Sequence, residues 1–257
     1  MRRLRAHRVL AAIRTASSCP VVVGTDDGTR FVKLRGAAQG TAALVAEVIV
    51  AELAEQLGLR VPARSLVTMD EDTPTDDRND ELADLLRFSH GVNLAFDWLE
   101  GARDFRSDET ATVPEEEASI VRWLDAFVVN PDRTARNPNL LVWRGQRWLI
   151  DHGASLGFQY DWRAIDENSP RRVYAFRQPH LFAARATLVG ELDELLAAML
   201  TRESLQHAAD QVPDEFLLPL LPPGADAEAV RRRRAAYAAY LWKRLAAPRP
   251  WVEALRA

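Results

Sequence analysis

The stretch NPDRTARNPNLLVWRGQRWLIDHG, residues 130–153, is the most informative part of this sequence. Two short apolar runs in it, LLVW and RWLID, flank a turn at Arg144–Gln146, which predicts two strands joined by a tight turn. The polar segment before the first run carries Asp132 and, five positions later, Asn137. A further carboxylate, Asp151, stands at the end of the second run. The stretch therefore combines a predicted pair of strands with three side chains that offer oxygen atoms.

Upstream of this stretch, the sequence predicts a second hairpin and a helix. Residues 20–34, PVVVGTDDGTRFVKL, alternate β-branched or aromatic residues around a Gly/Asp-rich turn, and Lys33 ends the second of these strands. Apolar residues at helical spacing predict a helix from Thr41 to Leu57, with Glu47 on it and Gly58 ending it. Further strands are predicted at residues 65–69 and 92–99, and further helices at 82–88, 115–129, 186–200 and 225–245.

The order of these elements predicts an α+β fold in two lobes. Strands dominate up to about residue 100, and helices dominate after the polar segment that follows it. We expect a small β-rich N-lobe of residues 1–100 and a mainly helical C-lobe of residues 101–257.

Composition excludes several classes of protein. The 257 residues contain 33 Lys and Arg against 37 Asp and Glu, a net charge of -4, so no overall basic field attracts nucleic acid. The single cysteine, Cys19, excludes an internal disulfide framework and a four-cysteine zinc site. The basic N-terminus begins like a signal peptide, but Arg8 and Arg14 interrupt its apolar run, and no apolar stretch is long enough to span a membrane. We expect a cytoplasmic protein that binds neither nucleic acid nor membrane.

Phosphoryl transfer gives each of the singled-out side chains a role. A strand lysine such as Lys33 can hold nucleotide phosphates if a helix carboxylate, here Glu47, fixes its flexible ammonium group. Asp132 can orient and deprotonate an acceptor hydroxyl. Asn137 and Asp151 offer hard oxygen ligands of the kind that Mg²⁺ prefers.

At this point the sequence resembles a known family. The segments FVKLRGAAQG, VAEVIVAELAEQLGLRVP, NPDRTARNPNLLVW and WLIDHG, in that order, are similar to the HipA-like branch of the protein-kinase-like superfamily. The D-x-x-x-x-N spacing matches the catalytic loop of protein kinases, and Asp151-His152-Gly153 occupies the place of their Asp-Phe-Gly. The resemblance runs from about Thr15 to Gly157.

The resemblance implies a two-lobed kinase fold that binds ATP with Mg²⁺ in the cleft between the lobes and phosphorylates a hydroxyl, in the type case a serine or threonine of a protein. It assigns Lys33 as the nucleotide lysine, Glu47 as its helix partner, Asp132 as the catalytic base, and Asn137 and Asp151 as the metal ligands. About fourteen residues precede the match, fewer than the N-terminal subdomain of toxin-type members, so a toxin role with an antitoxin partner does not follow from the resemblance.

The expected nucleotide contacts depart from the family pattern. The stretch that corresponds to the nucleotide-covering loop is TASSCP, residues 15–20, which contains no glycine. Ser17 and Ser18 can still donate hydrogen bonds to phosphates there, and Gln39 can cover the phosphates from the other side. The hinge that binds adenine is expected just after the strand at 92–99, where Glu100 lies.

Each of these residues also has an ordinary structural explanation. A lone lysine at a strand end is usually solvated, Asp132 can form a surface salt-bridge cluster with Arg133 and Arg136, and Asp151 can start an Asx turn. The joint order of the residues favours a kinase. Three alternatives stay open: a kinase of a small-molecule alcohol, a nucleotide-binding scaffold without turnover, and a nucleotidyl transferase.

Overall fold

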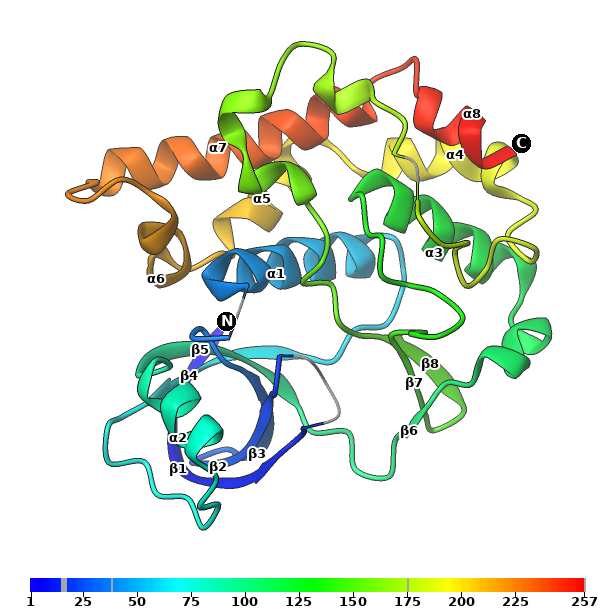
Figure 1. Cartoon of the computed structure of the whole chain (residues 1–257). Helices are drawn as coiled ribbons and strands as arrows, with labels where there is room; N and C mark the ends of the chain where they lie inside the picture. The colour runs from blue at the N-terminus through cyan, green and yellow to red at the C-terminus, as the bar shows by residue number, and fades with distance from the viewer. Residues whose placement is uncertain (15–17, 38, 175, 257) are drawn as a thin grey trace. The chain divides into compact units, whose positions relative to one another are not determined.

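The computed structural model describes residues 1–14, 18–37, 39–174 and 176–256 (Figure 1). The mixed α+β class is confirmed, because the N-terminal region is rich in strands and the C-terminal part is helical. The chain divides into two units. The first unit contains Met1–Val45, Pro62–Glu100 and Pro213–Pro222, and the second contains Ala46–Val61, Gly101–Val212 and Pro223–Ala257.

The strands of the first unit form a closed barrel. They are β1 (Arg2–Ala12), β2 (Val21–Thr25), β3 (Gly28–Lys33), β4 (Arg64–Met69) and β5 (Gly91–Asp97). Their order around the barrel is β1-β2-β3-β5-β4 (Figure 1). β1 pairs antiparallel with β2 and parallel with β4, and the remaining neighbours pair antiparallel. The predicted hairpin and the two predicted single strands are confirmed as β2–β3, β4 and β5.

Strand β1 is not predicted by the sequence, although its burial alternates. Its core-facing residues are separated by exposed arginines, which hide the strand pattern behind a basic composition. Arg5 donates from Nε to Asp70 Oδ2 at 2.7 Å, and Arg8 pairs with Asp76. These exposed ion pairs stabilise the strand only slightly, but they neutralise its charge. The buried residues of β1 are Leu4, Ala6 and Val9.

The barrel interior is filled by small aliphatic side chains. Helix α2 (Asp80–Arg87) adds Leu82 to this core, and Leu85 and Leu86 pack against it. Asn79 caps this helix, because its side-chain oxygen accepts from the backbone N–H of Leu82 at 2.9 Å. The buried cluster also includes Val21, Val23, Val32, Leu34, Val67, Met69 and Ala95.

Asn93 is a fully buried polar residue of the first unit, and its side chain links the segment after β3 to the start of β5. Its Nδ2 donates to the carbonyl oxygens of Ser89 at 2.8 Å and Gly91 at 3.0 Å. Its Oδ1 accepts from the backbone N–H of Arg35 at 2.8 Å. Asn93 therefore satisfies backbone groups after β3 and at the start of β5 that would otherwise lack a partner.

The second unit is built mainly from helices. Helix α1 (Gly40–Gln56) starts in the first unit and continues into the second, and α6 (Asp214–Leu217) belongs to the first. In the part of the chain that the structure describes, no helix is both long and apolar enough to cross a membrane. The other elements are β6 (Arg103–Asp104), α3 (Glu115–Phe127), β7 (Leu140–Trp143), β8 (Gln146–Leu149), α4 (Val189–Met199), α5 (Arg202–Asp210), α7 (Ala227–Leu245) and α8 (Pro250–Arg256).

Aromatic packing and a buried arginine hold α3, α7 and α8 together. The ring of Trp123 lies 5.3 Å from the rings of both Phe127 and Trp251. Arg244 on α7 donates from Nε to Phe127 O at 2.7 Å and from Nη2 to Ala126 O at 2.8 Å. These carbonyls end α3, where a positive charge is favoured by the helix dipole. Burial lowers the pKa of Arg244 to about 10, so the group stays charged at neutral pH.

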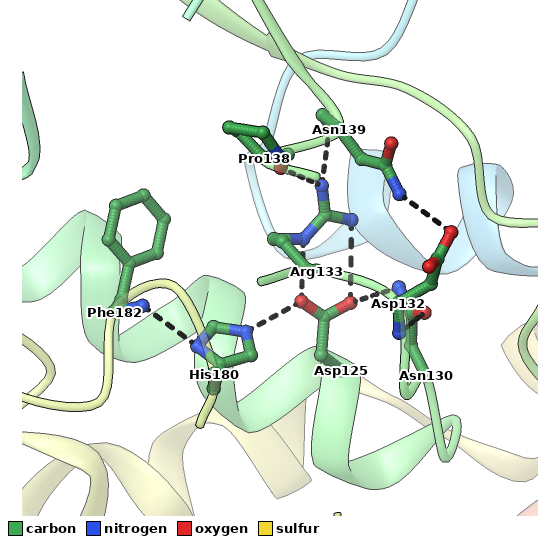
Figure 2. Close-up of polar contacts among 8 residues, drawn as sticks. All are labelled: Asp125, Asn130, Asp132, Arg133, Pro138, Asn139, His180 and Phe182. Carbon is green, nitrogen blue, oxygen red and sulfur yellow. Dashed lines mark hydrogen bonds and ion pairs between the residues drawn. The ribbon is translucent and has the colours of Figure 1, made fainter. Parts of the chain in front are cut away.

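The central polar contact of the second unit is a buried ion pair between α3 and the following loop (Figure 2). Arg133 donates from Nε to Asp125 Oδ2 at 2.6 Å, and the two side chains are 0% and 1% exposed. Arg133 Nη1 also donates to the carbonyl oxygens of Asn139 at 2.5 Å and Pro138 at 3.3 Å. Asn130 donates from Nδ2 to Asp125 Oδ1 at 2.8 Å. One ion pair thus binds both ends of the loop.

Replacing Asn93 with leucine should destabilise the first unit. Three backbone groups lose their partner, one in a buried and two in partly buried hydrogen bonds. A buried group left without a partner costs about 1–3 kcal/mol, so we expect the free energy of unfolding to fall by roughly 3 kcal/mol. Urea unfolding followed by circular dichroism measures this change. The control is Asn79→Ala, which removes a helix cap and should cost only about 1 kcal/mol. Equal losses in the two variants would contradict the role of Asn93.

Replacing Asp125 with asparagine should remove a pH-dependent part of the stability. Burial alone raises the pKa of Asp125, but the charge of Arg133 and hydrogen bonds from His180 and Arg133 outweigh it and hold the pKa below its ordinary value. A lowered folded-state pKa stabilises the protein above the unfolded-state pKa, about 3.9, and this stabilisation is lost as the pH falls toward the folded-state value.

We therefore expect Asp125→Asn to lower the melting temperature strongly at pH 7, with a gap to the parent that narrows below about pH 4. Thermal melts of both proteins from pH 7 to pH 3 test this. Asp210→Asn, at an exposed position on α5, should follow the parent at every pH. A gap that is constant or widens on acidification would refute the assignment.

Candidate active site

The β7–β8 hairpin brings the end of the Asp132 loop close to Asp151. The register pairs Leu140 with Leu149, and the backbone N–H of Ile150 donates to Asn139 O at 3.1 Å. Asn139 ends the polar loop, and Asp151 is the residue after Ile150. The predicted strands are confirmed, and their pairing fixes the end of the loop beside Asp151.

The carboxylate of Asp132 is held by amide groups of its own loop. Its Oδ2 accepts from Asn137 Nδ2 at 2.9 Å and from Asn139 Nδ2 at 3.2 Å. Its backbone N–H donates to Asn130 Oδ1 at 3.1 Å (Figure 2). Within the described residues, no hydrogen bond reaches Oδ1 of Asp132. One carboxylate oxygen is thus fixed, and the other can accept from a ligand.

The alternative that Asp132 and Arg133 form a surface salt-bridge cluster is wrong for Arg133. Its guanidinium group is buried and pairs with Asp125, as Figure 2 shows, and not with Asp132. Arg136 is exposed. The reason is the apolar surroundings of α3, in which Asp125 requires a cation more than the partly exposed Asp132 does.

Glu47 anchors the turn that contains Asp151. Glu47 is fully buried on α1, and its Oε1 accepts from the backbone N–H of Gly153 at 2.8 Å. His152, between Asp151 and Gly153, is also fully buried, and Asp151 has a positive φ of 59°. Asp and Asn adopt this left-handed conformation more readily than most residues. The structure thus joins Glu47 to the Asp151–Gly153 turn, and its predicted pairing with Lys33 stays a prediction.

The residues predicted to bind metal fit Mg²⁺ by their donor chemistry. Asn137 uses its amide nitrogen to bind Asp132, which leaves its carbonyl oxygen as the group able to coordinate a cation. Among the described residues, no group of three or more His, Cys, Asp or Glu side chains forms a metal cluster. Mg²⁺ does not need one, because it takes one or two protein ligands and completes its shell with phosphate oxygens and waters.

The described residues predicted to contact the nucleotide lie in the first unit, and Glu47, the predicted partner of Lys33, lies in the second. Lys33 is the last residue of β3 and is half-buried, on the opposite face of the strand from Val32 and Leu34, which point into the barrel core. Ser18 lies in the turn between β1 and β2, and Gln39 directly precedes α1. Ser17 lies outside the described residues.

Glu100 follows β5 by three residues and is tied to the same segment. Its carboxylate accepts a hydrogen bond from Trp98 Nε1 at 2.8 Å, and both residues are well exposed. The segment predicted to be the adenine hinge therefore contains a hydrogen bond between two of its own side chains, those of Trp98 and Glu100. Its role in binding a nucleotide stays a prediction.

Sequence reasoning missed two residues that contact the loop of Asp132, namely Asp125 and His180. Asp125 carried a signal, because it is the one carboxylate in the apolar run SIVRWLDAFVV. His180 carried none, because its Nε2 reaches Asp125 Oδ2, at 2.9 Å, from far along the chain. Burial lowers the pKa of His180, as do Arg133 and Arg122, while Asp125 opposes this. His180 is therefore neutral at pH 7.

Comparisons with known proteins concern the family and the fold of this chain. No curated protein matches the chain. A solved structure of the proinflammatory kinase CtkA from Helicobacter pylori is similar in fold, with a TM-score of 0.51 at 13% sequence identity, and the match covers 95% of this chain and 98% of that one. The family model described as HipA-like kinase matches residues 7–221. This match spans most of the sequence and confirms the resemblance, so the chain belongs to the HipA-like kinase family.

Proposed function

We propose that this protein is an ATP- and Mg²⁺-dependent kinase that phosphorylates a serine or threonine hydroxyl of a protein. Membership of the HipA-like kinase family and the fold similarity to a kinase support phosphoryl transfer. The observation that carries the proposal is the geometry of Asp132, whose Oδ2 is fixed by two amide groups. We also propose that the chain acts as two lobes, residues 1–100 and 101–257.

Asp132 has the chemistry of the catalytic base. The acceptor hydroxyl oxygen forms a bond to the γ-phosphorus of ATP, the bond from that phosphorus to the β–γ bridging oxygen breaks, and ADP leaves. The hydroxyl proton passes to Oδ1 of Asp132. Because Asn137 and Asn139 hold the other oxygen, the base is positioned before the acceptor arrives.

Asn137 and Asp151 would hold the metal, and Lys33 the phosphates. The metal that these two residues would hold would supply charge neutralisation at the phosphate oxygens. Glu47 keeps the Asp151 turn in place through Gly153. Ser18, Gln39 and the backbone around Glu100 are the proposed contacts to the rest of the nucleotide.

Replacing Asp132 or Asp151 with alanine should abolish transfer and leave the fold intact. Loss of a general base alone lowers the rate by about 10²–10⁴-fold. Asp151→Ala should weaken Mg²⁺-dependent nucleotide binding more than Asp132→Ala, because only Asp151 is a proposed metal ligand. Phosphotransfer assays and nucleotide titrations with and without Mg²⁺ measure both effects.

The matched control is Asp210→Ala, at the exposed end of α5, which should transfer phosphate at the parent rate. Labelled ATP separates the rival activities. Label from the γ position on protein supports the proposal, and label on a small alcohol alone identifies a small-molecule kinase. Label only from the α position identifies nucleotidyl transfer, and nucleotide binding without turnover identifies a scaffold. Asp132 and Asp151 variants that both transfer phosphate at the parent rate would refute the proposal.

A further inference from the structure

His180 makes two hydrogen bonds that together fix the proton on its ring. The backbone N–H of Phe182 donates to Nδ1 at 3.1 Å, so Nδ1 acts as an acceptor and carries no proton. Nε2 then carries the proton and donates it to Asp125 Oδ2 at 2.9 Å. Figure 2 shows the imidazole between these two partners. The contacts therefore select the neutral tautomer protonated at Nε2.

The main chain around His180 is paired with the catalytic loop. The backbone N–H of Leu181 donates to Arg133 O at 2.9 Å, and His180 forms an antiparallel bridge with Thr134. These partners are the two residues that follow Asp132. The backbone of Arg133 and Thr134 thus positions the His180 imidazole beside Asp125.

A short relay of hydrogen bonds connects the imidazole to Asp132. Asp125 accepts from His180 through Oδ2 and from Asn130 through Oδ1, and Asn130 in turn accepts the backbone N–H of Asp132. Asp125 also carries the Arg133 pair that reaches Asn139 O. Rotation of the Asp125 carboxylate would disturb both the start and the end of the loop.

We propose that His180 is a positioning residue of the kinase reaction, which orients Asp125 and through it the loop that carries Asp132. The proposal rests on the proposed function, because it names a residue that sets the geometry of the proposed base. His180 itself touches neither Asp132 nor the groups proposed to bind metal. Its role is to hold the Asp125 carboxylate in one orientation by donating from Nε2.

Two variants separate the two hydrogen bonds. His180→Gln places an amide nitrogen near the position of Nε2 and can still donate to Asp125. His180→Asn places an oxygen near the position of Nδ1, so it can accept from Phe182 but does not reach Asp125. Each variant loses one hydrogen bond, and a purely structural role predicts similar effects from both.

We expect His180→Asn to lower kcat by about ten-fold or more with an unchanged KM for ATP, since small displacements of a catalytic group are costly. His180→Gln should keep kcat within about two-fold of the parent. His207→Asn, at a histidine on α5, is the control and should match the parent. Equal losses in the Gln and Asn variants, or a parent-like Asn variant, would overturn the proposal.

The pH profile gives a second kinetic readout. Three charged side chains interact with the ring: Asp125 and Arg122 on α3, and Arg133 on the loop. Two more, Arg177 and Arg244, line a cavity of about 500 Å³ together with His180. Protonation of Nδ1 at low pH breaks the bond from Phe182. Protonation leaves the Nε2 donor to Asp125 in place, so the parent and His180→Gln should show the same dependence of kcat on pH. A loss of kcat on acidification in the parent alone would assign the role to the Phe182 contact and overturn the proposal.

Two measurements do not depend on phosphotransfer. Nitrogen-15 NMR of the histidine rings should show His180 protonated at Nε2 and not at Nδ1 at pH 7. Hydrogen exchange at the backbone amides of Asp132 and Thr134 should be faster in His180→Asn than in His180→Gln. If the parent transfers no phosphate, the proposed function fails, and these two measurements decide whether His180 positions the loop. Equal exchange in the two folded variants would overturn the positioning role. If His180→Asn does not fold, the NMR measurement on the parent still decides, because a proton on Nδ1 at pH 7 would overturn the role.

Discussion

The ion pair of Asp125 with Arg133 is the interaction on which the second unit depends. Removing two charges from water costs several kcal/mol for each ion, and this cost is met only if each charge is fully hydrogen-bonded. Asp125 meets the requirement with donors from Arg133, Asn130 and His180. Arg133 meets it with Asp125 and two carbonyl oxygens at the far end of the loop. Full satisfaction of the pair therefore requires one loop conformation, and this conformation places Asp132.

Much of the fold was predictable because local patterns agree with the final structure. The hairpin of β2 and β3, helices α1 and α3, and the hairpin of β7 and β8 follow from apolar spacing and turn residues near each element. Strand β1 was not predictable, since one of its two partners, β4, lies about sixty residues away, and two of its arginines, Arg5 and Arg8, are neutralised by acidic residues after β4. Only tertiary structure shows that the basic N-terminus is a strand.

The candidate site divides in the same way. The spacing of Asp132, Asn137 and Asp151 predicted a shared loop and hairpin, and the structure shows the bond between Asp132 and Asn137. The groups that hold these residues were not predictable. In the sequence, Asp125 only interrupts an apolar run, and nothing marks His180. The two side chains contact each other across 55 residues, and no sequence spacing indicates this contact. The basic run Arg231–Arg234 of α7 is likewise used within the unit, where Arg231 pairs with Glu228 and Arg234 donates to Val212 O.

The barrel unit takes in a piece of chain from far downstream. Residues Pro213–Pro222 belong to it, and Glu215 in this piece accepts from Arg3 at 2.8 Å and offers its carbonyl oxygen to Arg35. During synthesis the first hundred residues leave the ribosome well before this piece is made, and domains begin to fold as they emerge. A fragment that stops at residue 100 would leave Arg3 and Arg35 without these acceptors, so the contacts of the barrel unit can be completed only after residues 213–222 have been made.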